Sequence, residues 1–285
     1  MDHWIHKILD SHCHLWELGR FQYPWPTPDL AIHQDHLPEH LLQAMINTPV
    51  RDVVFVQCLN DCPEEAKWVM SLSREYKCIK GIVAGLDPTH PQFESRLVSL
   101  KEAVPLLVGV RHILDLDDRP HYLLEEDLVA GVNVLQAHNL TFDLLLRPPL
   151  LEEAVVLAGR VSAGARIVVD HLAKPYITAG KLDPWRQHIT ALARHPNLYC
   201  KLSGMVTEAD LEKWKTEDLR PYVEHVLSVF GPERLMFGSD WPVCRLASNT
   251  DYQRVFSTMR ELLQHLPHHH QEMIFSTNAR TFYNL

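Results

Sequence analysis

The segment RLMFGSDWPVC, residues 234–244, contains a short apolar run that ends at an acidic residue, Asp240. This run predicts a buried strand with the carboxylate at its end. A carboxylate in that place is costly unless it is paired, bound to a metal ion or used to move a proton. Asp240 is therefore the first candidate for a functional residue, and its meaning depends on which strands lie beside it.

Similar strand-like segments occur throughout the chain and alternate with helix-like segments. The predicted strands are 7–14, 51–57, 79–86, 107–114, 140–146, 165–173, 198–204 and 234–240. The predicted helices are 36–45, 63–76, 93–103, 124–138, 150–161, 184–194, 219–230 and 252–265, with one more at the C-terminus. Strands rich in valine, isoleucine and leucine that alternate with amphipathic helices are typical of a parallel sheet covered on both faces.

Eight such units in 285 residues predict an α/β fold, a single (β/α)8 TIM barrel with an extra C-terminal helix and one domain over residues 1–285. A doubly wound sheet is the alternative. That fold usually has a glycine-rich phosphate-binding turn after its first strand, but residues 11–14 read SHCH there. The barrel is therefore the favoured fold.

The composition argues against several kinds of partner. The chain has 27 basic and 36 acidic residues, a formal charge of −9, and no basic cluster, so we expect no nucleic-acid partner. It has neither an apolar run of the ~18 residues that a membrane span needs nor a recognisable signal peptide. Its six cysteines lack CxxC spacing. We therefore expect a cytoplasmic protein with no membrane partner, and the sequence leaves a homo-oligomer open.

Two histidines near the start of the chain are candidates to lie beside Asp240. Asp10, His12 and His14 are spaced by two in the first predicted strand, so their side chains are expected on one face. The first and last strands of a closed barrel are neighbours, and active sites of such barrels lie at the C-terminal ends of the strands. His171, near the end of the sixth predicted strand, is the third imidazole expected there.

Charged residues on the middle strands are further candidates. Arg111 and His112 face opposite ways on the fourth strand, and the sequence does not say which one points inward. Asp170 is expected to face away from His171 and to anchor a neighbouring loop. Lys201 lies within the seventh strand, where a free ammonium group would be costly.

Two more features leave alternatives open. Asp143 and Arg147 share a face of the fifth strand, and either an ion pair between them or a substrate contact fits this spacing. The aromatic residues Tyr23, Trp25 and Trp241 are consistent either with a wall on which a sugar stacks or with loop packing.

Taken in order, the motifs resemble those of the amidohydrolase superfamily of barrel hydrolases. Within it they are similar to the amidohydrolase-2 branch and its L-fuconolactonase-like and L-rhamnonolactonase-like sugar lactonases. The motifs that carry the resemblance are DSHCHLW with YPW, GVRH, TFDLLL, VVDHLAKP, YCKLSGMVTEAD, LRPYVEHVLSVFGPERLMFGSDWPVC and NARTFY. The resemblance implies a barrel enzyme that hydrolyses an ester or lactone, with His12, His14, His171 and Asp240 at the core of its site.

These observations combine into one hypothesis, a carboxylic ester hydrolase of carbohydrate metabolism that opens a sugar-acid lactone such as L-fuconolactone with water. Asp240 and His171 are the expected catalytic residues, and Asp240 is the general base. One divalent ion, zinc or manganese, is expected on His12, His14, His171 and Asp240, with a metal-free mechanism left open. The expected substrate contacts are Arg111, His112, Arg147, Lys201, Trp25 and Trp241.

The superfamily's two-metal members carry a carbamylated lysine on strand four and a histidine on strand five. Here Arg111 or His112 and Asp143 stand on those strands, so a two-metal site is not expected. The alternative functions are a metal-dependent decarboxylase of the same superfamily and a non-catalytic barrel that binds a ligand. The sequence does not specify the sugar or its ring size.

Overall fold

The computed structural model describes residues 8–285, and in this part of the chain eight parallel strands form one sheet in sequence order. The strands are β1 Ile8–Cys13, β2 Val50–Val56, β3 Ile79–Gly85, β4 Leu107–Ile113, β5 Thr141–Leu145, β6 Ile167–Val169, β7 Leu198–Leu202 and β8 Leu235–Phe237. Lys7, where the first predicted strand begins, lies outside the described residues. So do the first residues of the N-terminal stretch for which no signal peptide is predicted.

The sheet closes on itself at the C-terminal ends of its first and last strands. The backbone N–H of Asp240 donates to the carbonyl of His12 at 2.8 Å, and that of His14 donates to the carbonyl of Trp241 at 2.7 Å. Cys13 and Trp241 form a parallel bridge beside these bonds. The predicted (β/α)8 barrel is therefore confirmed, and its closure brings Asp240 next to the histidines of β1.

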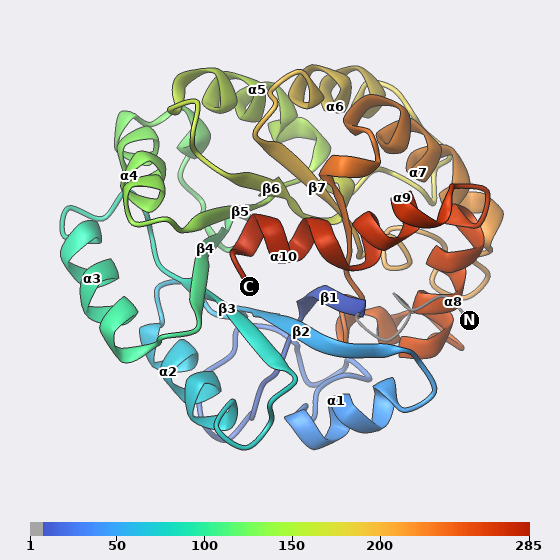
Figure 1. Ribbon diagram of the computed structural model, residues 1–285, viewed down its shortest axis with the longest axis horizontal. Coiled ribbons are helices and arrows are strands. Elements are labelled where there is room, and N and C mark those ends of the chain that lie inside the picture. The colour runs from blue at the N-terminus through green and yellow to red at the C-terminus, as the bar shows by residue number, and fades with distance from the viewer. Residues whose placement is uncertain (1–7) are drawn as a thin grey trace.

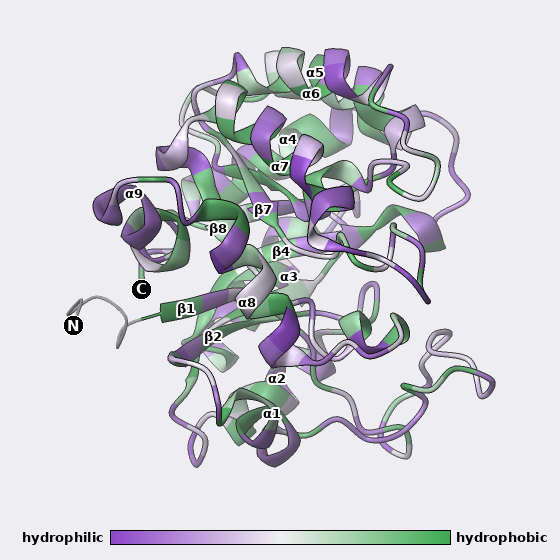
Figure 2. Cartoon of the chain, turned by 90° about the vertical axis from the view of Figure 1, so that its right-hand side faces the viewer, coloured by the Kyte–Doolittle hydropathy of each residue, from purple (hydrophilic) through white to green (hydrophobic). Residues whose placement is uncertain are grey.

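Helices surround the barrel (Figure 1). They are α1 Pro38–Met45, α2 Pro63–Leu72, α3 Phe93–Ala103, α4 Glu126–Ala137, α5 Leu151–Arg160, α6 Trp185–Ala193, α7 Thr216–Phe230 and α8 Tyr252–Leu263. Their hydrophobic and hydrophilic residues tend to lie on different sides (Figure 2). Local sequence explains where two of these helices begin. Helix α2 begins at Pro63, because proline is well tolerated in the first turn of a helix. Before α8, the side chain of Asp251 accepts a hydrogen bond from the backbone N–H of Arg254 and caps the helix.

The last helices of the chain cover the N-terminal end of the barrel strands. After α9 His268–Glu272 and a π-helical turn at Met273–Thr277, helix α10 Asn278–Tyr283 lies across this end (Figure 1). Phe282 and Tyr283 pack against inward-facing strand residues such as Val54 and Met236. The predicted extra C-terminal helix thus closes the N-terminal end of the strands, and the opposite end remains for a site.

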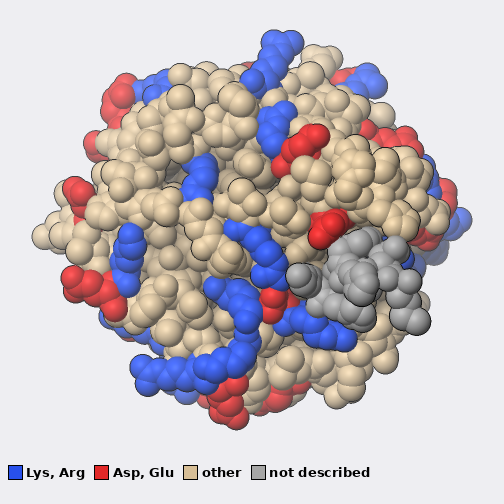
Figure 3. Space-filling view, viewed as in Figure 1, with Lys and Arg blue, Asp and Glu red and all other residues tan. Residues whose placement is uncertain are grey.

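The structure also bears on membrane spans, cysteines and surface charge. In the described part of the chain, no helix combines the length and the apolar character needed to cross a membrane. All six cysteines carry free thiols. The face drawn in Figure 3 carries lysine and arginine side chains alongside aspartate and glutamate.

Candidate active site

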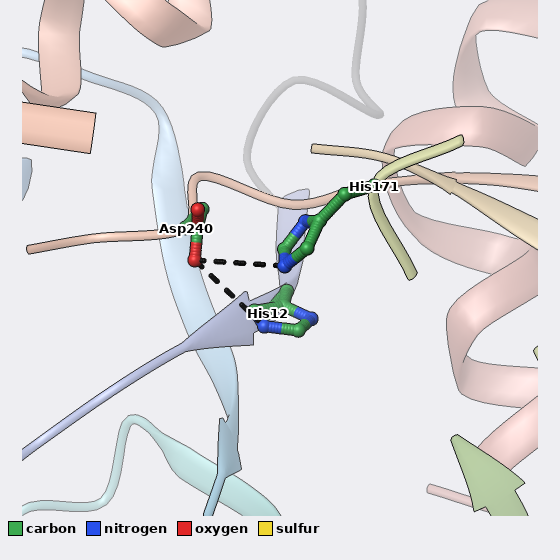
Figure 4. Close-up of side chains that lie close together, drawn as sticks. All are labelled: His12, His171 and Asp240. Carbon is green, nitrogen blue, oxygen red and sulfur yellow. Dashed lines mark ion pairs between the residues drawn. The ribbon is translucent and has the colours of Figure 1, made fainter. Parts of the chain in front are cut away.

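Three of the predicted site residues meet at the C-terminal end of the barrel. His12 comes from β1, His171 follows β6 and Asp240 follows β8, and the three side chains point toward one another (Figure 4). Oδ1 of Asp240 lies 3.8 Å from Nε2 of His12 and 3.9 Å from Nε2 of His171. One ligand atom from each of the three residues lies within 4.8 Å of the others, which is a spacing that a single metal ion can bridge.

His14 lies at the edge of this group. Its Nε2 is 3.3 Å from Oδ1 of Asp240 and 3.2 Å from Nε2 of His12. Its Nδ1 is 2.8 Å from the carbonyl oxygen of Val56, and because a carbonyl only accepts, Nδ1 carries the proton of the neutral ring. In the neutral ring, Nε2 of His14 then presents a lone pair toward the carboxylate of Asp240.

This arrangement fits a divalent cation. A lone pair that faces a carboxylate oxygen at 3.3 Å is unfavourable unless a cation or a proton lies between them. Ligand atoms on a tetrahedral zinc ion at roughly 2.0–2.1 Å lie about 3.4 Å apart, close to the 3.2–3.9 Å separations found here. Nδ1 of His171 lies 2.8 Å from the hydroxyl of Ser203, so Nε2 is directed at the site. Metal-binding histidines are commonly oriented by such a hydrogen bond on their other ring nitrogen.

The surroundings set the charges of these groups. Burial alone would raise the pKa of Asp240, but His171, His14 and His12 outweigh it and hold that pKa below its usual range. Burial lowers the pKa of His171 to about 4 and lowers the pKa of His12 well below its usual value. At neutral pH, Asp240 is therefore an anion, and His12 and His171 are neutral.

A buried charged cluster lies beneath the site, and we call Asp143, Lys201, Asp170 and Arg111 the buried quartet. Nζ of Lys201 lies 2.5 Å from Asp143 and 3.0 Å from Asp170. Arg111 donates to Asp170 at 3.0 Å. The cluster also contacts the Nδ1 edge of the His12 ring: Nδ1 is 3.1 Å from Nζ of Lys201 and 3.4 Å from Oδ1 of Asp170.

The buried quartet corrects two expectations. Asp170 does not face away from the site, because β6 ends at Val169 and the backbone turns left-handed at His171, so strand alternation does not extend past Asp170. Asp143 does not pair with Arg147, because Arg147 lies beyond the end of β5 and pairs with Asp115 outside the barrel interior. The inward residue of strand four is Arg111.

Asp10 also differs from its prediction. Its carboxylate accepts hydrogen bonds from the backbone and hydroxyl of Ser239 and from the hydroxyl of Tyr252 in α8. It therefore points outward rather than sharing a face with His12 and His14. The cause is an irregular register between Asp10 and Cys13 in the pairing of β1 with β2, which interrupts the alternation of side chains.

A cavity of about 430 Å³ opens above the site. Of the residues predicted to contact a substrate, Arg111, Arg147 and Trp25 line it. The other three lie behind its wall: Lys201 is fully buried, His112 is 2.6 Å from Asp117 and stacks on Tyr122, and Trp241 packs edge-on against His36. A direct substrate contact predicted for Lys201, His112 or Trp241 is thus not supported by their positions.

The cavity also includes residues that sequence reasoning did not select. Asp115 follows β4, Lys174 follows β6 and Glu208 follows β7, and Trp16 lies beside Trp25. The sequence did offer one indication of these residues, because each of the three charged residues comes soon after a predicted strand. Their convergence depends on loop conformations, which the letters alone do not give.

Comparison with known proteins agrees with this fold. The amidohydrolase family profile matches residues 9–285, so the chain belongs to the amidohydrolase family. The chain is 34% identical to an L-fucono-1,5-lactonase from Burkholderia ambifaria, over 85% of this chain and 82% of the relative. It is 33% identical to an L-fucono-1,5-lactonase from Burkholderia multivorans, over 85% of this chain and 84% of the relative.

Solved structures show the same architecture. An amidohydrolase from Burkholderia multivorans with bound zinc superposes with a TM-score of 0.87 and 29% identity, covering 98% of this chain and 99% of the other. A 2,6-dihydroxybenzoate decarboxylase is more distant, with a TM-score of 0.62 and 14% identity, covering 98% of this chain and 99% of the other, and it shares the fold alone.

Proposed function

We propose that the protein is a lactonase that opens a sugar-acid lactone, an aldonolactone such as L-fuconolactone, by attack of water on the lactone carbonyl. The observation that carries the proposal is Asp240, an ionised carboxylate that faces three imidazoles at the floor of a cavity of about 430 Å³. A cavity of this volume accepts a ligand of monosaccharide size. The two lactonase relatives support the same reaction.

In the proposed mechanism, Asp240 acts first as a base and then as an acid. It accepts a proton from water while the water oxygen bonds to the carbonyl carbon, which gives a tetrahedral intermediate. The ring ester C–O bond then breaks, and the proton on Asp240 moves to the leaving ring oxygen. The product is the open hydroxy acid. His171 is held by Ser203 so that its Nε2 points at the reacting groups.

The histidines of β1 and β6 would hold the cofactor. His12, His171 and Asp240, with His14 beside them, are the proposed ligands of one divalent ion, zinc or manganese, which would polarise the lactone carbonyl. The buried quartet fixes the ring of His12 through its Nδ1. Imidazole N–H groups that donate directly to the carbonyl oxygen are the metal-free alternative.

The proposal extends to the surroundings of the reaction. Arg111, Arg147 and Trp25 are the proposed substrate contacts among the residues predicted from sequence, because they line the cavity. The six free thiols support a reducing compartment such as the cytoplasm.

A panel of aldono-1,4- and aldono-1,5-lactones tests the function. We expect acid release from at least one of them, measured with a pH indicator, and we expect the Asp240→Asn variant to lack it. Release of carbon dioxide from an aromatic or sugar acid, with no lactone hydrolysed, would point to the decarboxylase instead. Specific binding of a lactone without turnover would favour the non-catalytic barrel.

Metal analysis of protein purified without added ions separates the two forms of the mechanism. We expect one divalent ion per chain, loss of activity after chelation, and recovery with a single added metal. His12→Ala should lower bound metal and activity in proportion. Full activity in protein that contains no metal would assign the histidines to direct stabilisation of the carbonyl oxygen.

A further inference from the structure

Four charged residues that contact one another line the cavity, and we call them the mouth quartet: Asp115, Arg147, Lys174 and Glu208. They follow β4, β5, β6 and β7 in that order, so four successive strand ends each supply one member. Asp240 and His171 line the same cavity. A substrate whose carbonyl lies at Asp240 therefore has the mouth quartet within the same enclosed space.

The contacts within the mouth quartet centre on Asp115. Arg147 reaches its two carboxylate oxygens through Nε and a terminal nitrogen at 3.1 Å, and Nζ of Lys174 lies 3.3 Å from Oδ2. Lys174 and Arg147 outweigh the effect of burial and hold the pKa of Asp115 below its usual value. The two cations are thus oriented by Asp115 with donor N–H groups to spare.

Glu208 is the least satisfied member. Its ionic partner in the described part of the chain is Arg147, at 3.8 Å, which is beyond hydrogen-bonding distance. The side chain is 17% exposed, and burial raises its pKa. An acceptor without a short partner therefore lies beside the donors of Arg147 and Lys174. A hydroxyl group both donates and accepts, so it complements this pairing.

The backbone that presents Lys174 is strained. Residues 171–174 all have positive φ, at 53°, 53°, 59° and 48°, and none is glycine. Such a conformation is unfavourable for residues with a Cβ atom, and strain of this kind is found where surrounding structure fixes a functional geometry. Here the indole of Trp185 donates to the carbonyl of Leu172 at 2.6 Å. The left-handed turn places His171 and Lys174 in the same cavity.

The charge balance and the apolar lining of the cavity indicate the class of ligand. Two acids and two bases make the mouth quartet neutral, and the guanidinium of Arg111 is already paired with Asp170. An additional carboxylate or phosphate on the substrate would therefore meet no uncompensated cation among these side chains. The apolar residues Trp25, Trp16, Val243 and Leu246 also line the cavity and suit the C–H face of a sugar ring.

We propose that the mouth quartet is the subsite that binds the ring hydroxyls of an uncharged polyhydroxylated lactone and so determines substrate specificity. This inference rests on the proposed lactonase function and adds what the substrate must carry besides its ester. Asp115 orients the cations, Arg147 and Lys174 donate to hydroxyl oxygens, and Glu208 accepts from hydroxyl protons.

The test compares an active aldono-1,5-lactone with δ-valerolactone, which has the same ring ester and no hydroxyls. For Lys174→Met and Glu208→Gln, we expect the loss in kcat/KM on the hydroxylated lactone to exceed the loss on δ-valerolactone by at least about tenfold. Lys181→Met, an exposed lysine outside the cavity lining, is the matched control and should leave both rates unchanged. Equal losses on the two lactones, or no loss on either, would overturn the assignment.

A binding measurement separates this subsite from the reaction itself. A 1,5-anhydroalditol carries the ring hydroxyls and lacks the carbonyl, and calorimetry should show binding to the wild type that weakens at least about fivefold in Lys174→Met and Glu208→Gln. That result without turnover of any lactone would reject the lactonase and keep the hydroxyl subsite. Turnover of an aldonolactone together with unchanged anhydroalditol binding in both variants would reject the subsite and keep the lactonase.

Discussion

The buried quartet and the mouth quartet have the same composition in charge, two carboxylates and two cations each, and opposite exposure. Lys201, Asp143 and Asp170 have fully buried side chains, whereas Arg147 is 46% and Asp115 34% exposed. Charges without access to water must be paired inside the protein, so the buried quartet is fixed and can hold His12 in place. Partly solvated charges exchange partners at little cost, so the mouth quartet can bind a ligand.

The largest expected effect comes from removing a cation of the buried quartet. Lys201→Met leaves Asp143 and Asp170 without their shared ammonium group, and breaking a buried pair of this kind costs about 3–5 kcal/mol. Chemical denaturation should show this loss. Lys80→Met is the control, because Lys80 pairs with Asp52 on the surface and should cost less than about 1 kcal/mol. A stable Lys201→Met protein with impaired turnover would instead give Lys201 a role in catalysis.

An intermediate effect is expected at Glu65, a buried acid with no ion pair to the described residues. Glu65 in α2 accepts hydrogen bonds from the backbone N–H groups of Cys58 and Leu59, but burial raises its pKa to about 8. Asp170 is the opposite case, because Lys201, His12 and Arg111 overcome burial and hold its pKa low. At Glu65, the folded state then binds a proton that the unfolded state releases above its ordinary pKa of 4.5. The stability from this proton is complete below pH 4.5 and is lost as the pH rises toward 8.

Replacing Glu65 by glutamine tests this sign. Glu65→Gln keeps an acceptor for both backbone groups and cannot ionise, so it should remove a decline in stability of a few kcal/mol between pH 5 and pH 8. Thermal denaturation across that pH range measures it. Glu64→Gln, in the exposed neighbour that pairs with Lys67, should keep the wild-type profile. An unchanged profile in Glu65→Gln would show that this carboxyl group is ionised in the folded protein.

The smallest effect on stability is expected in the mouth quartet. Arg147→Met removes a partly exposed ion pair with Asp115 and should change the free energy of unfolding by less than about 1 kcal/mol. Its effect should appear in kinetics, as a higher KM for a hydroxylated lactone. A loss of stability comparable to that of Lys201→Met would mean that exposure does not separate the two quartets.

Sequence alone was sufficient for the parts of the site that follow from barrel closure. His12, His14 and Asp240 meet because β1 and β8 are adjacent and their carboxyl ends lie at one edge. The inward position of Asp170 could not be predicted, because four non-glycine residues in a left-handed turn carry no signature in their letters. The outward position of Asp10 depends on a local register irregularity, which alternation rules do not include.

Of the mouth quartet, the sequence predicted Arg147 as a substrate contact and did not predict the other three residues. Asp115, Lys174 and Glu208 lie on loops, and their meeting depends on the path of each loop rather than on the period of a strand. An ion pair between Arg147 and Asp143 was one of two alternatives, and it assumed that the period of two continues past Leu145, the last residue of β5. Strand periodicity therefore predicts contacts only as far as the strand extends.

In the proposed mechanism Asp240 moves the proton in lactone hydrolysis, and the Asp240→Asn variant tests this role. Asparagine keeps the shape of the side chain and removes the basic oxygen, so kcat for an aldonolactone should fall at least about a thousandfold, which is ~4 kcal/mol of transition-state stabilisation. Circular dichroism and thermal denaturation would establish that the variant is folded. A folded variant that retains activity within about tenfold of the wild type would show that Asp240 is not the general base.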